Sequence, residues 1–416
     1  MRYLLVLCMG IFLYGADATL EIVKNVDSRP SVTIEDASSF GNSYIKKRFF
    51  RLVLGDLKVT SHFKVDDSYR VVEYSAPVNP MLRQNNYLVR YSFKEADGQR
   101  LILDFKVFDM RGKGWVFERR YRVSNRVRYP FLIHQAVIDF NSFLGLPSVE
   151  WMKRYVVLSQ YTKSKHSKIL IADYTLTYRK TIISGGLNIF PKWADKNQKG
   201  IYYTKIGWKP TLYYYNIYTG KRRKVVSSDG MLICSDVSRD GKKLLLTKAP
   251  NGQPDIYLYN IKSGKQQRLT FYSGIDVSGQ FVDGERAIVF VSDRLGKPNI
   301  FKLKIRKRGV SQLVYHGRNN SSCTAHGKYI VYTSRESNNA FSSNTFNLYL
   351  ASTQSDYIRR LTASGINQFP KLSQDGKSVL YIKHYASQSA LGVVRLEYNE
   401  GFLFPLSGLK IQSIDW

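Results

Sequence analysis

The chain has 416 residues, of which 44% are hydrophobic and 14% aromatic. This composition excludes a disordered polypeptide, and the length leaves room for two or more domains. Lysines and arginines outnumber acidic residues by 63 to 32, a formal net charge of +31. Residues 151–416 carry +25 of this charge and residues 19–150 only +6. Such a field favours acidic partners or polyanionic surfaces.

The first eighteen residues predict a cleaved secretory signal. Arg2 gives a positive start, residues 3–14 are apolar, and Ala16-Asp17-Ala18 is a small-x-small cleavage site. A membrane anchor is the alternative, but spanning a bilayer takes about 20 apolar residues. We therefore expect an exported chain that starts at Thr19, with no transmembrane segment after cleavage and no nucleic acid among its partners.

Residues 19–34 are polar and predict a flexible N-terminal arm that a partner orders. The alternative is a plain edge strand over 20–26. An arm that alternates between docked and free states would couple its binding site to others in the molecule. Its apolar positions are the candidate contacts, namely Leu20, Ile22, Val23 and Val26.

Residues 35–150 predict a small α+β domain. Strands are expected within 49–60, 86–110 and 115–124, because these segments are rich in β-branched and aromatic residues. A helix is expected over 129–146, where apolar residues recur at helical spacing before Gly145 and Pro147.

An internal repeat dominates residues 151–416. The turn residues Asp240, Asp283 and His326 are each 43 positions apart, and Asp375 follows 49 later. Each repeat offers four short alternating strands, which is the pattern of one β-propeller blade. We predict a mainly β protein with a six-bladed propeller, preceded by the α+β domain.

The two ends of the propeller region complete each other. Residues 155–185 supply three strands without a first one, and residues 409–416 supply one strand alone. Pairing them would close the ring. It would also provide hydrogen-bond partners for the backbone groups that both pieces otherwise expose at a strand edge.

The domain order, the 129–146 helix, and repeat endings such as SGKQQRLT (263–270) and YIRRLT (357–362) resemble the TolB family of the Tol-Pal system. The usual proline of the family's turn is missing, with Arg239 and Gln374 in its place. The resemblance implies a periplasmic, non-enzymatic linker that is monomeric outside its complexes. It implies binding of the peptidoglycan-associated lipoprotein Pal at the propeller mouth and of TolA through the arm, with other outer-membrane proteins as further partners. The linker would support outer-membrane integrity and constriction at division.

The family's contact positions precede each turn by a few residues. By that resemblance, the candidate mouth residues are Asn188, Ile189, Phe190, Leu232, Asp276, Asn320, Asn367, Gln368 and Phe369. For the neighbouring Ile233, Cys234 and Val277 we favour blade core over partner contact.

Two other functions compete with that of a linker. A peptidase of the propeller type needs a G-x-S-x-G nucleophile elbow, which is missing here. A polyanion- or glycan-binding basic propeller is the stronger alternative. The basic clusters at 221–224 and 306–308 fall where hairpin tips are expected, and there we favour solvated charges that block edge pairing over a dedicated binding patch. The histidines fall at no metal-ligand spacing, so we expect no metal and no cofactor.

Overall fold

The computed structural model describes residues 29–416 except 97, 99, 113, 308, 336–344 and 407–409. The predicted signal and the arm residues Leu20, Ile22, Val23 and Val26 lie outside the described residues.

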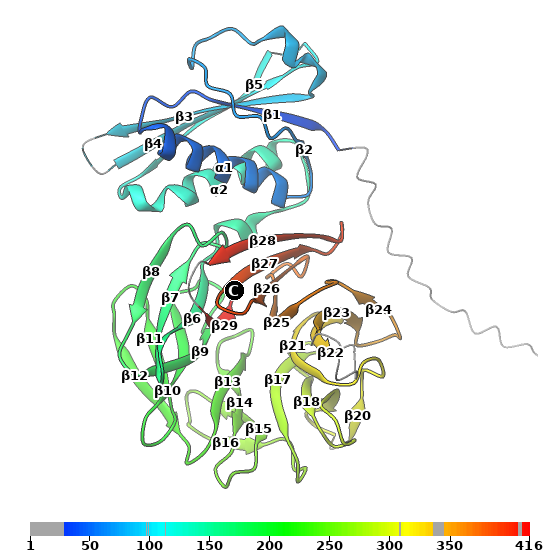
Figure 1. Ribbon diagram of the computed structural model, residues 1–416. Helices are drawn as coiled ribbons and strands as arrows, with labels where there is room; N and C mark the ends of the chain where they lie inside the picture. The colour runs from blue at the N-terminus through cyan, green and yellow to red at the C-terminus, as the bar shows by residue number, and fades with distance from the viewer. Residues whose placement is uncertain are drawn as a thin grey trace, which may run out of the picture.

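The N-terminal region is a five-stranded sheet in the order β2-β1-β3-β4-β5, with two helices between the sheet and the propeller (Figure 1). Short 3-10 turns span Pro80–Gln84, Arg126–Arg128 and Glu150–Lys153. The elements are β1 (Ser31–Asp36), α1 (Ser43–Val59), β2 (Lys64–Val65), β3 (Tyr87–Ala96), β4 (Arg100–Asp109), β5 (Gly114–Val123) and α2 (Tyr129–Phe143).

The helix α2 confirms the one predicted over 129–146, but the strand predicted over 49–60 is wrong. That segment is the second half of α1. Phe49, Val53 and Leu57 recur every four residues and are buried on one helix face, a spacing that outweighs the β-branched and aromatic composition. The side chain of Asn42 caps the helix start by accepting a hydrogen bond from the Ile45 backbone amide.

The predicted arm also ends too late. Residues 31–34 belong to β1, which lies between β2 and β3 in parallel pairing. Val32 and Ile34 are fully buried in the core of the sheet. The first four residues of β1 are therefore part of the folded domain and not of a loose arm.

The rest of the chain forms short antiparallel sheets arranged as a propeller (Figure 1). Three of them are consecutive four-stranded units: β9 (Leu187–Trp193), β10 (Gly200–Ile206), β11 (Thr211–Asn216) and β12 (Arg222–Ser227); β13 (Leu232–Val237), β14 (Lys243–Lys248), β15 (Asp255–Asn260) and β16 (Gln266–Arg268); β17 (Asp276–Val282), β18 (Ala287–Ser292), β19 (Asn299–Lys304) and β20 (Val310–Gln312).

The next sheet has eight strands in two four-stranded units, joined by one parallel residue pair between Phe346 and Ile366. The predicted count of six blades depends on taking these units as separate blades. They are β21 (Asn320–His326), β22 (Tyr329–Arg335), β23 (Phe346–Ser352) and β24 (Ile358–Arg360); then β25 (Ile366–Leu372), β26 (Ser378–His384), β27 (Ser389–Arg395) and β28 (Glu400–Leu406).

The last sheet joins the two ends of the propeller region. The C-terminal strand β29 (Ile411–Asp415) pairs with β6, in the order β29-β6-β7-β8. This is the pairing that the sequence predicts, and β29 also contacts β25 and β9 on either side. Its partners are β6 (Val156–Lys163), β7 (His166–Ala172) and β8 (Arg179–Ile183).

The propeller has two distinct faces. The first strand of each unit begins at what we call the mouth face and ends at the turn face, where the repeated Asp-Gly turns lie. The end of β7 is also at the turn face, because Asp415 pairs with Val157 and Ala172 with Val156. The N-terminal region contacts the propeller at the turn that follows β7.

The two basic clusters differ from expectation. Arg306 and Lys307 lie in the turn between β19 and β20, as predicted, whereas Arg308 is outside the described residues. Arg222 and Arg223 lie within β12 and not at its tip, and their guanidinium groups stack on Tyr213 and Tyr214.

Candidate partner-binding site in the propeller channel

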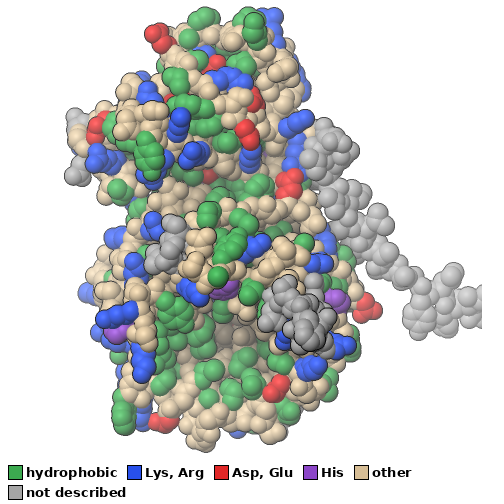
Figure 2. Space-filling view, viewed as in Figure 1, with side chains coloured by type: hydrophobic (Ala, Val, Ile, Leu, Met, Phe, Trp, Pro, Cys, Tyr) green, Lys and Arg blue, Asp and Glu red, His purple; other side chains and the backbone are tan. Residues whose placement is uncertain are grey.

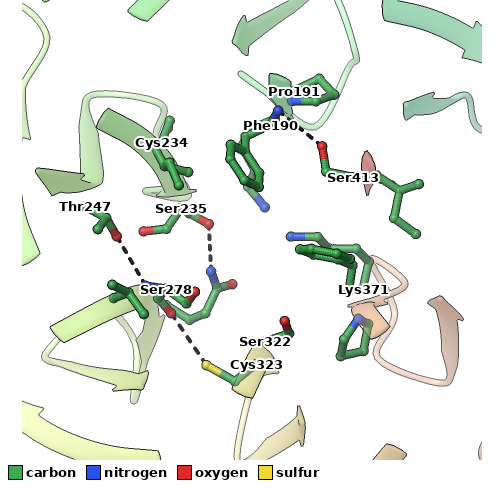
Figure 3. A pocket seen from close by; sticks show the side chains of 17 residues that line it. Phe190, Pro191, Cys234, Ser235, Thr247, Ser278, Ser322, Cys323, Lys371 and Ser413 are labelled. Carbon is green, nitrogen blue, oxygen red and sulfur yellow. Dashed lines mark hydrogen bonds between the residues drawn. The ribbon is translucent and has the colours of Figure 1, made fainter. Parts of the chain in front are cut away.

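The first strands of the units surround one central cavity of about 100 Å³ (Figure 3). Side chains from β9, β13, β17, β21, β25 and β29 all reach it. Figure 2 shows hydrophobic side chains gathered around a hollow at the centre of the propeller. A channel that collects residues from distant segments is where propellers bind partners or ligands.

Two predicted residues on this wall have unusual backbone conformations. Phe190 and Phe369 have φ angles of 51° and 52°, the left-handed region that side chains with a Cβ avoid at about 1–2 kcal/mol. Each sits at a β-bulge and precedes a proline, Pro191 and Pro370, which narrows its backbone freedom further. Both rings are half-buried and line the cavity. Strain of this kind concentrates at functional sites.

Three predicted asparagines form a structural set at the mouth face. The side chains of Asn188, Asn320 and Asn367 are buried and donate hydrogen bonds to carbonyls of the loop that leads into their own strand. Their acceptors are Gly185, His316 and Ser364, at 3.0, 2.7 and 3.0 Å respectively. These amides therefore hold the mouth loops in place.

The other predicted residues fall into two groups. Asp276 is fully buried and forms an ion pair of 3.0 Å with Arg294, and Leu232 belongs to a buried apolar cluster between two units. Ile189 and Gln368 are half-buried, and Gln368 lines a second cavity at the mouth face beside Tyr385. Partner contact by all nine residues stays a prediction. Only Ile189, Phe190, Gln368 and Phe369 are accessible in the structure.

The charged groups of the channel were missed by the sequence reasoning. Lys192 Nζ lies 3.1 Å from Asp415 Oδ1 and 3.5 Å from Asp236 Oδ1. Burial alone would lower the pKa of Lys192, but these two carboxylates outweigh burial and raise it. The only available signal was a lysine two positions after each phenylalanine, Lys192 and Lys371.

Lys371 has a different environment. Its Nζ lies 3.6 Å from Asp415 Oδ1, beyond hydrogen-bonding distance. Burial and the nearby charge of Lys192 lower the pKa of Lys371. The channel thus holds one ammonium group paired with two carboxylates and a second whose single ion pair, with Asp415, is longer.

The mouth face also exposes large apolar side chains that the sequence analysis passed over. Trp208 is 98% exposed in the turn after β10, and Leu295 is 65% exposed in the turn after β18. Phe271 and Tyr315 are exposed in the loops that lead into β17 and β21. Large apolar residues in polar turns were the signal that could have found them.

Comparison with known proteins agrees with this architecture. A family model described as the TolB beta propeller domain matches residues 152–406. The Tol-Pal system protein TolB of Wolinella succinogenes is 49% identical over 100% of both chains, and that of Helicobacter hepaticus is 47% identical over 99% of both. This chain belongs to the TolB family. The resemblance seen in the sequence is confirmed.

A solved structure supports the fold independently. The crystal structure of TolB from Acinetobacter baumannii matches with a TM-score of 0.75, over 94% of this chain and 97% of that chain. The two sequences are 21% identical, so this match concerns the TolB fold alone.

The root of the predicted arm is attached to the propeller. Arg29, the first described residue, forms an ion pair of 2.8 Å with Glu400 at the start of β28 and stacks over the ring of Tyr398. β28 belongs to the same four-stranded unit as β25, which carries Phe369. The arm root therefore contacts the same sheet that carries Phe369 at the channel wall.

Proposed function

We propose that this chain is a non-enzymatic, periplasmic interaction scaffold of the Tol-Pal system. It binds a peptidoglycan-associated lipoprotein at the mouth face and a TolA-like, inner-membrane-anchored protein through the arm of residues 19–30. This linkage supports outer-membrane integrity and constriction at cell division. Membership of the TolB family supports the proposal.

The observation that carries the mouth assignment is the pair of strained phenylalanines. The left-handed backbone recurs at the bulges of other units, at Ser278 and Ser322, but Phe190 and Phe369 combine it with a following proline and a large ring. Here two such residues place aromatic rings at one cavity from strands that are far apart in sequence. Aromatic side chains are frequent hot spots of protein interfaces. Here two half-buried aromatic rings lie among loops that the buried asparagines fix in place.

Binding of the lipoprotein's soluble domain by calorimetry tests this proposal. We expect the variant Phe190→Ala/Gln368→Ala/Phe369→Ala to bind at least 100-fold more weakly than residues 19–416 of the natural sequence, because each hot-spot truncation costs about 2 kcal/mol. The weakening should be similar at low and high salt, since the truncated side chains would meet the partner through desolvated, largely apolar surfaces.

The matched control is Tyr218→Ala, which removes an aromatic ring that is 70% exposed in the β11–β12 turn at the turn face. It should bind the lipoprotein domain as the natural sequence does. Equal affinities of the triple variant and the natural protein would reject the mouth assignment.

The arm is tested separately. Deletion of residues 19–28 should abolish binding of the TolA-like domain and leave lipoprotein binding intact. Glu400→Gln should release Arg29 at the arm root and change affinity for the TolA-like domain, because the docked state of the arm loses its ion pair. Unchanged affinity in both variants would remove the arm from the proposal.

A further inference from the structure

A further concave surface lies away from the mouth, around β19. One cavity of about 720 Å³ separates β19 from the preceding unit, and a neighbouring cavity of about 480 Å³ lies on the side of Thr353. Lys302, Lys304 and Lys307 line both cavities. We call this continuous surface the basic groove.

The charge of the basic groove is not balanced within the fold. Six cationic side chains line the larger cavity against two carboxylates, Asp283 and Glu285. Both carboxylates are engaged: Asp283 pairs with Lys302 at 2.7 Å, and Glu285 accepts a hydrogen bond from the Arg239 backbone amide. The remaining cations have no carboxylate within 4 Å in the described part of the chain, and they are Lys243, Arg286, Lys304, Arg306 and Lys307.

Protection of a sheet edge does not account for this arrangement. Charges that block edge pairing belong on the outermost strand, which here is the three-residue β20. Lys302 and Lys304 instead lie on β19, one strand further in, and reach into the groove. Concentrating like charges around a cavity weakens the fold unless an anion occupies the site.

The groove also has an apolar wall. Leu258, Phe281 and Ile305 line the larger cavity next to the cations, and all three are half-buried. A bare phosphate or polyphosphate would make no use of such a surface. A sugar ring presents an apolar face and hydroxyl edges, and fits a site where apolar and charged groups alternate.

We propose that the basic groove binds an anionic glycan, that is, a saccharide chain carrying phosphate or carboxylate groups. The ammonium and guanidinium groups pair with its anionic substituents, and Phe281 contacts a sugar face. The groove lies at the turn-face end of its units, because the turns after β17 and β19 form it. A glycan bound there leaves the mouth face free for a protein partner.

Affinity measurements with defined probes test the proposal on the full mature chain. The probes are deacylated lipopolysaccharide for phosphate-bearing sugars, hyaluronan fragments for carboxylate-bearing sugars, uncharged dextran fragments, and inorganic polyphosphate. We expect binding of at least one anionic glycan and none of dextran. Whichever of the two glycans binds with higher affinity identifies the anionic group, phosphate or carboxylate, and hence the source of the glycan.

Two triple variants, each with three positive charges removed, distinguish specific binding in the groove from general attraction by the net positive charge of the protein. Lys304→Gln/Arg306→Gln/Lys307→Gln should weaken glycan binding at least tenfold. Lys199→Gln/Lys221→Gln/Lys224→Gln, three exposed residues of the β9–β12 unit, should weaken it less than threefold. Phe281→Ala should weaken glycan binding but not polyphosphate binding.

Several outcomes would overturn the assignment. These are equal weakening by the two triple variants, no glycan binding by the natural protein, and binding of polyphosphate but of neither glycan. Unfolding temperatures of the variants exclude misfolding as the cause. Lipoprotein binding by the groove variant should be unchanged, so the groove and the proposed mouth function succeed or fail independently.

Discussion

Two regions of the molecule bury charged side chains, and they do so in opposite ways. At the junction between the N-terminal region and the propeller, His134 on α2 lies between two carboxylates, with Nδ1 2.6 Å from Asp56 and Nε2 3.3 Å from Asp173. The Tyr174 hydroxyl donates to Asp56 at 2.5 Å. All four side chains are fully buried, and each polar atom of Asp56, His134 and Tyr174 has a partner.

The channel differs because its charges face an open cavity. Lys192 pairs closely with Asp415, Lys371 reaches the same carboxylate only at 3.6 Å, and two phenylalanines with strained backbones lie beside them. The comparison teaches that burial of charge alone does not mark a binding site. A closed network fixes two parts of the fold against each other, whereas charge and strain left beside a cavity are available to a partner.

The largest expected effect concerns β29, which lines the channel and belongs to the sheet whose β7 leads into the junction. Deletion of residues 409–416 removes β29, whose Ile411 and Ile414 are buried and whose Asp415 pairs with Lys192. We expect loss of the cooperative fold, seen by circular dichroism and size-exclusion chromatography, because β6 and the neighbouring units no longer have the strand that joins them. Deletion of residues 19–28 is the control and should leave the fold intact. A folded, monomeric protein without β29 would contradict the ring closure predicted from the sequence.

The two channel lysines should respond differently to replacement. Lys192→Met leaves Asp236 without its cation and Asp415 with only the more distant Lys371, and should lower the free energy of unfolding by about 3 kcal/mol. Lys371→Met should change it by less than about 1 kcal/mol in either direction, because its charged form is already disfavoured in the fold. Urea unfolding measures both values. Equal losses would mean that the two lysines share one network.

The junction should give the protein a characteristic pH dependence. Burial alone would lower the pKa of His134, but Asp56 and Asp173 outweigh burial and raise it to about 9. The ordinary value is 6.5, so the stabilisation is complete below about pH 6.5 and is lost as the pH rises toward 9. We expect a decrease on the order of 2 kcal/mol in the free energy of unfolding.

His134→Gln provides the control for this pH effect, since its side chain does not titrate. The variant should be less stable at pH 6 and should lack the decrease between pH 6.5 and 9. An identical slope in both proteins would assign the pH dependence to other groups.

The smallest effect isolates backbone strain in the channel. Phe369→Gly and Phe369→Ala both remove the ring, but only glycine adopts a φ of 52° without strain. We expect the glycine variant to be more stable than the alanine variant by about 0.5–1 kcal/mol, although glycine is the more flexible residue when unfolded. Thermal unfolding decides this. The reverse order would mean that the backbone relaxes once the ring is gone.

The sequence by itself determined the features that rest on local periodicity. The turns at Asp240, Asp283, His326 and Asp375 recur after 43, 43 and 49 residues, and this spacing predicted the repeated unit. Apolar residues at helical spacing predicted α2, and the incomplete first unit predicted the pairing of the C-terminal strand. The strand predicted over 49–60 failed because its composition was given more weight than its helical spacing.

Only the tertiary structure decided which residues can meet a partner. Asn188 and Phe190 are two positions apart on one strand. The Asn188 side-chain amide is buried against its own loop, whereas Phe190 has a strained backbone and places its ring at the cavity. The approach of Lys192 to Asp415 and the grouping of Lys243 with Lys304 join residues from different units. Lys192 meets Asp415 because β29 lies against β9, and Lys243 lies near Lys304 because consecutive units pack side by side. No local pattern in the sequence encodes either contact.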